Sequence, residues 1–247
     1  DLTIDNITVI NGYAVHGGAI DIDAGTLILA NCTFSNNNAD YGGAIYIGSV
    51  TADEDAMVIG YNTTFTNNYA SDEGGAVYIA SGMQDTSASF YLCTFLYNYH
   101  GEDEDKKINY FAGGNADEIT TQYCIFNANG TIYSVDMDKI NQTVTVNGIS
   151  IDIFDSVVLM YFDMVPIYTI NNNGSKSFNV TFEDVMGGNY TVGVMDNHNF
   201  NIYVFEDRFE MRVPNFIISE DEVYENLTDA IDAVAENGII YANMNRS

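Results

Sequence analysis

Hydrophobic positions in the first half of the chain recur with a period of about thirty residues. A phenylalanine followed three residues later by asparagine occurs four times, with spacings of 31, 30 and 31 residues, at Phe34, Phe65, Phe95 and Phe126. Within each unit apolar and polar residues alternate as in short strands, and no helical periodicity intervenes. This pattern predicts a stack of coils built from parallel strands.

A second motif marks the turn before one strand of each coil. Gly-Gly-Ala followed by Ile or Val occurs at residues 17–20, 42–45 and 74–77. Glycine adopts φ > 0 without a Cβ clash, so each pair is expected to turn a corner. In coil four we align Gly113-Gly114 with this pair, after an insertion, and Asn115 replaces the alanine.

Two further columns follow from aligning the coils on phenylalanine. Two residues before it stand Cys32, Thr63, Cys93 and Cys124, which the alternation places on the inward face. We favour buried free thiols over a Cys93–Cys124 disulfide, and a metal site is disfavoured because C-x-x-C spacing is absent. Three residues after it stands an asparagine, which predicts a structural ladder of side-chain amides at Asn37, Asn68, Asn98 and Asn129.

From about residue 131 the glycine motifs stop and longer alternating strands begin. They are predicted at residues 142–147, 157–162, 167–171, 177–182, 190–195 and 201–205. This pattern favours a β-sandwich. Tyr190 follows the turn Gly187-Gly188, where the hydroxyl of a tyrosine corner bonds backbone upstream. This second half of the chain resembles bacterial-type immunoglobulin-like (Ig-like) modules. The alternative is a generic β-sandwich.

The last segment, after Pro214, predicts a helix and then a strand. Ser219 and Glu222 have the spacing of a capping box, and an apolar helix face ends at Gly238, before a strand over 239–241. The face comprises Leu227, Ala230, Ile231 and Val234. Two interpretations stay open, the opening of a further repetitive unit and a helix packed on the sandwich.

The net charge of the chain excludes some classes of binding partner. The 247 residues carry 35 acidic against 7 basic side chains, a formal net charge of −28. Such a field repels phosphate backbones and anionic lipid head groups, so we expect no nucleic-acid binding.

No apolar stretch has the length of a membrane span, and the N-terminus lacks signal-peptide features. We therefore expect no membrane insertion by this segment, a monomer within a longer chain, and an export signal or anchor elsewhere.

The Gly-Gly-Ala-(Ile/Val) and Phe-x-x-Asn motifs resemble the repeats of chlamydial polymorphic membrane proteins. Their Asn- and Tyr-rich, Lys-poor form is similar to adhesin-like surface proteins of methanogenic archaea. Both resemblances imply a right-handed parallel β-helix displayed outside the cell, here over about residues 1–130. The expected fold is all-β, with that β-helix, an Ig-like β-sandwich over 131–213, and a helix-strand start of a further unit over 214–247.

The function expected from these features is that of an extracellular adhesin-like structural and binding module. Its rod and acidic loops would contact a cell-surface protein or glycan of another cell. Tyrosines at positions 41, 46, 61, 69 and 78 offer an amphipathic contact surface, although tyrosine is also common in strands. Ten Asn-x-Ser/Thr sequons suggest a glycoprotein, and the main candidates are Asn6, Asn31, Asn62, Asn141 and Asn179.

An enzyme acting on polysaccharides, of the glycoside hydrolase type, is the first alternative, because parallel β-helices also host such enzymes. A lyase is disfavoured, since residues 1–130 contain no basic side chain except Lys106 and Lys107. A hydrolase needs two carboxylates across a cleft, for which Asp21 with Asp23, or Asp53 with Asp72, are candidates. The Asp21–Asp23 pair is not continued by acids in the next coils, where Tyr46 and Tyr78 stand, so we predict no enzymatic activity and no catalytic residues.

A calcium-dependent binding module is the second alternative. Hard cations bind clustered carboxylates, but no acidic cluster here matches a calcium-loop spacing, and solvated loops are favoured. We expect no cofactor, and Ca²⁺ would bind only under this alternative. The candidate ligands are Asp53, Glu54, Asp55, Glu102, Asp103 and Asp105.

Overall fold

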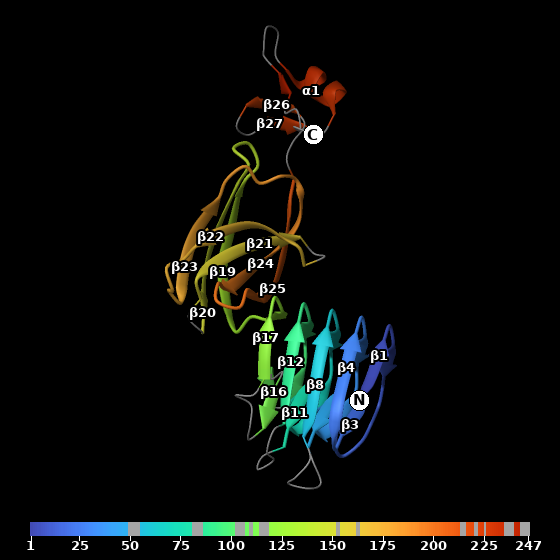
Figure 1. The fold of residues 1–247 in the computed structure, drawn as a ribbon. Helices are drawn as coiled ribbons and strands as arrows, with labels where there is room; N and C mark the ends of the chain where they lie inside the picture. The colour runs from blue at the N-terminus through green and yellow to red at the C-terminus, as the bar shows by residue number, and fades with distance from the viewer. Residues whose placement is uncertain are drawn as a thin grey trace. The chain divides into compact units, whose positions relative to one another are not determined.

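The computed structural model describes residues 1–48, 55–80, 86–101, 107–108, 111–113, 119–151, 154–161, 164–212, 216–219, 222–224, 226–234 and 240–242. The chain divides into two compact units (Figure 1). Unit 1 comprises Asp1–Ala128 together with Met195–Val204, and unit 2 comprises Asn129–Val194 and Phe205–Ser247. The described residues are mostly β-strand, in agreement with the all-β prediction.

Unit 1 is a stack of coils, each of which contributes short strands to parallel sheets. Sheet A consists of β1 (Leu2–Asp5), β4 (Gly25–Ala30), β8 (Ala56–Tyr61), β12 (Ser87–Tyr91) and β17 (Ile119–Gln122) (Figure 1). Sheet B contains β2 (Thr8–Ile10), β5 (Thr33–Ser35), β9 (Thr64–Thr66), β13 (Thr94–Leu96) and β18 (Ile125–Asn127).

Two smaller sheets complete the coils. Sheet C contains β6 (Asn38–Tyr41), β10 (Tyr69–Glu73), β14 (Tyr99–His100) and β15 (Lys107–Ile108), of which β15 runs antiparallel to β14. Sheet D contains β3 (Ile20–Ile22), β7 (Ile45–Ile47), β11 (Val77–Ile79) and β16 (Phe111–Gly113). In coils two and three each repeated motif of the sequence therefore occupies the same place.

The pairing is in register, so identical side chains stack in columns. Phe34 pairs with Phe65, and Phe65 with Phe95. The ring centroids of successive phenylalanines, from Phe34 to Phe126, are 5.2, 4.8 and 5.3 Å apart, with interplanar angles of 15° or less. These rings are almost completely buried, and they form the centre of the hydrophobic core. The predicted inward phenylalanine column is therefore present.

The inward cysteines lie beside this column. Cys32, Cys93 and Cys124 are buried and free, and Thr63 occupies the same place in coil three. The Cys32 thiol donates to the Ala30 carbonyl at 3.1 Å, and the Thr63 hydroxyl donates to the equivalent Tyr61 carbonyl at 2.9 Å. Both side chains thus satisfy a corner carbonyl while they fill a small core volume.

A second buried column consists of asparagines. The Asn37 amide donates to Asn68 Oδ1 at 3.0 Å, and the Asn68 amide donates to Asn98 Oδ1 at 2.9 Å. The Asn68 and Asn98 amides also donate, each at 2.9 Å, to the Phe34 and Phe65 carbonyls. These side chains therefore satisfy turn groups that have no strand partner.

The fourth predicted residue of this ladder, Asn129, lies outside the column and is exposed. Asn127 stands at its end instead, where its Oδ1 accepts from the Tyr97 backbone N–H at 2.6 Å. The prediction was wrong at this position because the chain leaves the coil geometry directly after β18.

Left-handed residues turn the corners between sheets. Gly17, Gly42 and Gly74 have φ between 54° and 72°, as the glycine motif predicts. Backbone crowding adds a second reason for glycine, because a Cβ on Gly42 would lie 2.2 Å from the Ile45 carbonyl oxygen.

Coil four differs from the predicted alignment. Gly113 pairs with Ile79 as the last residue of β16, whereas Gly17, Gly42 and Gly74 precede the corresponding strands. The predicted alignment was wrong for Gly113, because the inserted residues move it past the corner. Gly114 and Asn115 lie outside the described residues.

A remote segment forms the last rung of unit 1. The first residues of β25 (Asn201–Met211) pair in parallel with β18, with Ile202 opposite Ile125 and Tyr203 opposite Phe126. The Tyr203 ring stacks on Phe126 at 5.3 Å and thus extends the phenylalanine column. Asn201 Oδ1 accepts from the Cys124 backbone N–H at 2.9 Å. Sequence periodicity did not reveal this rung because it lies far from the repeats.

Unit 2 contains antiparallel strands. One group has the order β19 (Gly130–Asp138), β20 (Thr143–Ser150), β23 (Ser177–Phe182). The other has the order β25, β24 (Gly188–Asp196), β21 (Ser156–Tyr161), β22 (Pro166–Asn171). All six predicted strands are present, and β19 is an additional one. Tyr190 is fully buried and its hydroxyl donates to the Met186 carbonyl at 2.9 Å, which confirms the predicted tyrosine corner.

The end of the chain contains the predicted helix and a strand after it, but also a hairpin that was not predicted. Ser219 and Glu222 pair across a hairpin of β26 (Phe216–Ser219) and β27 (Glu222–Tyr224), and β28 (Tyr241–Ala242) pairs with β26. The helix α1 (Leu227–Ala233) begins after Asn226, whose side chain accepts from the Asp229 N–H. The predicted capping box was therefore wrong, because an asparagine cap closer to the helix satisfies its first turn.

The predicted apolar face of this helix is also only partly buried. Ala230 is fully buried, whereas Leu227 and Ile231 are about half exposed. Gly238 and Ile239 lie outside the described residues.

Replacing Asn68 by alanine is expected to destabilise unit 1. The change removes acceptors for the backbone and side-chain N–H groups of Asn37 and a donor for the Phe34 carbonyl, all of them in or beside the core. We expect a loss of about 3 kcal/mol in the free energy of unfolding, measured by urea denaturation followed by circular dichroism. The matched control is Asn129→Ala, for which the change should stay within about 0.5 kcal/mol. Equal losses for both variants would contradict the assignment of the ladder.

Replacing Asn201 by alanine is expected to loosen the end of the stack. The Cys124 N–H loses its acceptor, and the Thr121 hydroxyl loses the Asn201 amide that donates to it at 2.7 Å. Amide exchange at residues 124–127 should accelerate about tenfold or more, measured by hydrogen–deuterium exchange. The control, His198→Ala, removes an exposed side chain of the same segment and should leave this exchange unchanged.

Candidate functional site

The tyrosines named by the sequence lie on separate faces of unit 1. Tyr41 and Tyr69 belong to sheet C, Tyr46 and Tyr78 belong to sheet D, and Tyr61 ends β8 in sheet A. Tyr69 is engaged internally, because its hydroxyl donates to the Gly101 carbonyl at 2.7 Å. The predicted single contact surface is therefore two surfaces.

The first surface gathers aromatic and acidic side chains over sheets C and D. The Tyr46 ring lies between His16 and Tyr78, at centroid distances of 4.3 and 5.5 Å. Loss of hydration, followed by repulsion from Tyr78 and Asp21, raises the pKa of the Tyr46 hydroxyl. A hydrogen bond to the Asp72 carboxylate raises the pKa of Tyr41. These rings cover one another, and their hydroxyls stay protonated at neutral pH.

Asp21, from one of the two carboxylate pairs that are hydrolase candidates, belongs to this surface. Asp21 stands opposite Tyr46 in the register of sheet D. Partial burial and then the charge of Asp23 raise the pKa of Asp21. The positions that continue its column are Tyr46 and Tyr78, as the sequence indicated. Asp53 lies outside the described residues.

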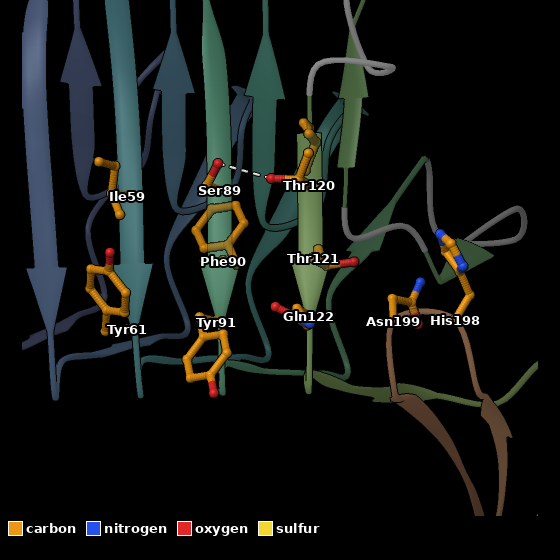
Figure 2. Close-up of a pocket in the computed structure, with 11 residues that line it drawn as sticks. Ile59, Tyr61, Ser89, Phe90, Tyr91, Thr120, Thr121, Gln122, His198 and Asn199 are labelled. Atoms are coloured by element: carbon orange, nitrogen blue, oxygen red, sulfur yellow. Dashed lines mark hydrogen bonds between the residues drawn. The ribbon is translucent and has the colours of Figure 1, made fainter.

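The second surface is a groove on the outer face of sheet A (Figure 2). Its floor has two rows that run from coil to coil. One row is Ile59, Ser89 and Thr120, and the other is Tyr61, Tyr91 and Gln122. The hydroxyls of Ser89 and Thr120 are 2.9 Å apart and hydrogen-bonded, as Figure 2 shows. The groove has a volume of about 630 Å³.

The remote segment Met195–Val204 closes one end of this groove. His198 and Asn199 line it beside β17 (Figure 2). The Tyr123 backbone N–H donates to the Asn199 carbonyl at 3.0 Å, so the same contact that completes the last rung also positions the groove wall.

An aromatic ridge begins with Tyr61 and Tyr91 on the groove floor and continues beyond the groove lining with Tyr123 and Phe200. Centroid distances between successive rings are 6.5, 5.3 and 5.2 Å. Each ring is 39% to 47% exposed, in contrast to the buried phenylalanine column. The first two contacts are tilted and edge-on, at 59° and 74°, so Tyr61, Tyr91 and Tyr123 do not stack face to face with one another.

Two members of the ridge occupy strained backbone positions. Tyr123 and Phe200 have φ of 54° and 58°. Asparagine occupies this corner in the first three coils, where Asn31 has φ of 52°, and Leu92 occupies it in the fourth, with φ of 54°. Asparagine tolerates this left-handed region, whereas large side chains rarely adopt it. Such strain of about 1–3 kcal/mol concentrates at functional sites. The corner geometry alone therefore does not account for aromatic residues here.

Sequence reasoning identified one member of the ridge, Tyr61. Tyr91 shares its place four residues before the coil phenylalanine, and this signal was present in the alignment. Tyr123 stands one residue later in its coil, and no repeat pattern leads to Phe200, His198 or Asn199.

The predicted glycosylation sites differ in what their amides contact. Asn6, Asn31, Asn62, Asn141 and Asn179 are all exposed. However, the Asn62 amide donates to Asn31 Oδ1 and the Asn31 amide donates to Asp5 Oδ1, each at 2.9 Å, one coil apart. The Asn141 amide donates to Asp138 at 2.7 Å. Glycans on Asn31 and Asn62 would disrupt this outer ladder and crowd each other. Occupancy of all five sequons stays a prediction.

The calcium prediction falls almost entirely outside the described residues. Asp53, Glu54, Glu102, Asp103 and Asp105 are not among them, and Asp55 is exposed at the start of β8. Within the described part of the chain, no group of three or more His, Cys, Asp or Glu side chains is arranged to hold a metal ion.

Among the residues that the structure describes, no helix has the length and apolar character needed to cross a bilayer.

Comparison with known families supports the repeats. Residues 31–48 and 62–80, in coils two and three, match the Chlamydia polymorphic membrane protein repeat. The match includes both Phe-x-x-Asn turns and both Gly-Gly-Ala motifs, so the predicted resemblance is confirmed for these coils. No curated protein and no solved structure gives a significant match to the chain. The chain thus contains repeats similar to those of polymorphic membrane proteins.

Proposed function

We propose that this chain is an extracellular, adhesin-like structural and binding module of a larger cell-surface protein. In this proposal unit 1 is a right-handed parallel β-helix that serves as a rigid support, and unit 2 is an Ig-like β-sandwich. The repeat match carries the proposal, because it relates the coils to proteins described as polymorphic membrane proteins. The parallel in-register columns and the tyrosine corner support the two fold assignments.

The groove and ridge of sheet A are the proposed contact surface. Exposed large aromatic side chains beside hydrogen-bonding groups are typical of recognition surfaces. Here they come from neighbouring coils in register, so the support fixes their spacing. A rigid, pre-arranged surface loses little conformational entropy on binding.

Binding to cell surfaces tests this proposal. The fluorescently labelled chain should bind intact cells or isolated cell envelopes saturably, measured by flow cytometry or by sedimentation. Thr120→Arg places a large charged side chain on the exposed floor of the groove and should reduce binding about tenfold or more. The control Thr131→Arg changes an exposed strand threonine of unit 2 and should bind as the unaltered chain does.

Two outcomes contradict the proposal. Absence of saturable binding to every surface would remove the adhesive role. Binding that resists Thr120→Arg but is lost when the acidic residues 102–106 are replaced by a Gly-Ser segment of equal length would move the contact to the acidic insertion.

A further inference from the structure

The chemistry of the groove restricts what it binds. The described residues that line it carry hydroxyl, amide, imidazole, aromatic and aliphatic groups, and none of them is an Asp, Glu, Lys or Arg. The chain as a whole, by contrast, has a net charge of −28. The described lining therefore offers no carboxylate, ammonium or guanidinium group for an ion pair with a charged ligand, and the negative field of the whole chain repels anionic ligands.

The groove repeats along the coil axis. Ser89 and Thr120 occupy the same register position in neighbouring strands, and so do Tyr61 and Tyr91. Neighbouring strands are about 4.8 Å apart. Equivalent groups at regular intervals along an open groove match a linear ligand that is itself made of repeating units.

The ridge provides flat apolar surfaces for such a ligand. The tilted contacts between Tyr61, Tyr91 and Tyr123 leave parts of their ring faces open to solvent. The C–H face of a pyranose ring packs on an aromatic face, and the hydroxyls at the rim of the sugar need hydrogen-bonding partners nearby. Ser89, Thr120 and Gln122 are exposed and present both donors and acceptors.

A folded protein is a poorer match for this surface. Protein interfaces depend on a few anchors that are fully desolvated in deep pockets. Here the groove runs along the exposed face of sheet A, and its floor mixes hydroxyl and amide groups with aromatic and aliphatic ones.

We propose that the groove and ridge of sheet A bind an uncharged polysaccharide chain that lies along the coil axis. Successive sugar rings pack against Tyr61, Tyr91 and Tyr123, and Phe200 extends the ridge at its end. The hydroxyls of Ser89 and Thr120 exchange their mutual hydrogen bond for bonds to sugar hydroxyls. This inference rests on the proposed function and names the ligand class of its contact surface.

A glycan array followed by isothermal titration calorimetry tests the inference on the full chain. The array carries neutral hexose and N-acetylhexosamine oligomers beside uronate and sulfated oligomers of equal length. We expect binding to neutral oligomers, affinity that rises with oligomer length, and little change between low and high NaCl.

Substitutions in the ridge test how much the packing of sugar rings on tyrosine rings contributes to the binding affinity. The double variant Tyr61→Ala with Tyr91→Ala should lower the affinity about tenfold. Tyr91→Phe keeps the ring and should stay within about twofold of the unaltered chain. Tyr133→Ala, an exposed tyrosine of unit 2, is the matched control and should bind normally. Circular dichroism and urea denaturation verify that each variant is folded.

The results distinguish this inference from the proposed function. Cell binding without binding to any neutral oligomer overturns the inference and leaves the adhesin-like function standing. If protease treatment of the cells abolishes cell binding, and the array shows no binding, the ligand of the surface is a protein. This result also overturns the inference and leaves the adhesin-like function standing. Selective binding of acidic oligomers, or equal losses in Tyr133→Ala and the double variant, also overturns it. If the chain binds neither cells nor glycans, both proposals fail.

Discussion

In-register parallel stacking of the coils is the constraint on which unit 1 depends. Because each inward position recurs directly above itself, a side chain there packs against the equivalent side chain of the next coil. Phenylalanine satisfies this by parallel stacking, as in the Phe65–Phe95 pair at 4.8 Å and 0°. Asparagine satisfies it because its amide carries both a donor and an acceptor, so that Asn68 accepts from one coil and donates to the next. Few other side chains can repeat in this way without a void or an unpaired polar group.

Outward positions escape this constraint, and their chemistry varies from coil to coil. In sheet D the aligned residues are Asp21, Tyr46 and Tyr78, and in sheet A they include Ile59 and Ser89. The stacked core fixes where these side chains stand and leaves their identity free. A recognition surface can therefore change by substitution without a change of fold, which is consistent with a module whose role is contact.

The same distinction explains what the sequence predicted and what it did not. Columns that repeat from coil to coil, such as the phenylalanines and the corner glycines of the first three coils, are local patterns with a fixed period, and they were predicted residue by residue. Asn129 was misplaced because the period persists in the sequence after the chain has left the coil. The rung at Asn201 and the groove wall at Asn199 depend on a pairing between segments more than seventy residues apart, and no periodicity records it. The part of the proposed site that lies on the repeated coils could be found by aligning the repeats. The part that the remote segment contributes became apparent only in the structure.

The last rung connects stability to recognition. An open parallel edge at β18 would expose unpaired backbone groups, which invite pairing with other chains. Residues of the segment Met195–Val204 pair with that edge, and the same segment contributes Phe200 to the ridge and Asn199 to the groove. Phe200 repeats the left-handed corner of Tyr123 and stacks on it with an interplanar angle of 6°. If that rung detaches, the ridge loses its end and the Tyr123 corner loses its partner. The free energy that holds the rung in place therefore also sets how completely the contact surface is formed.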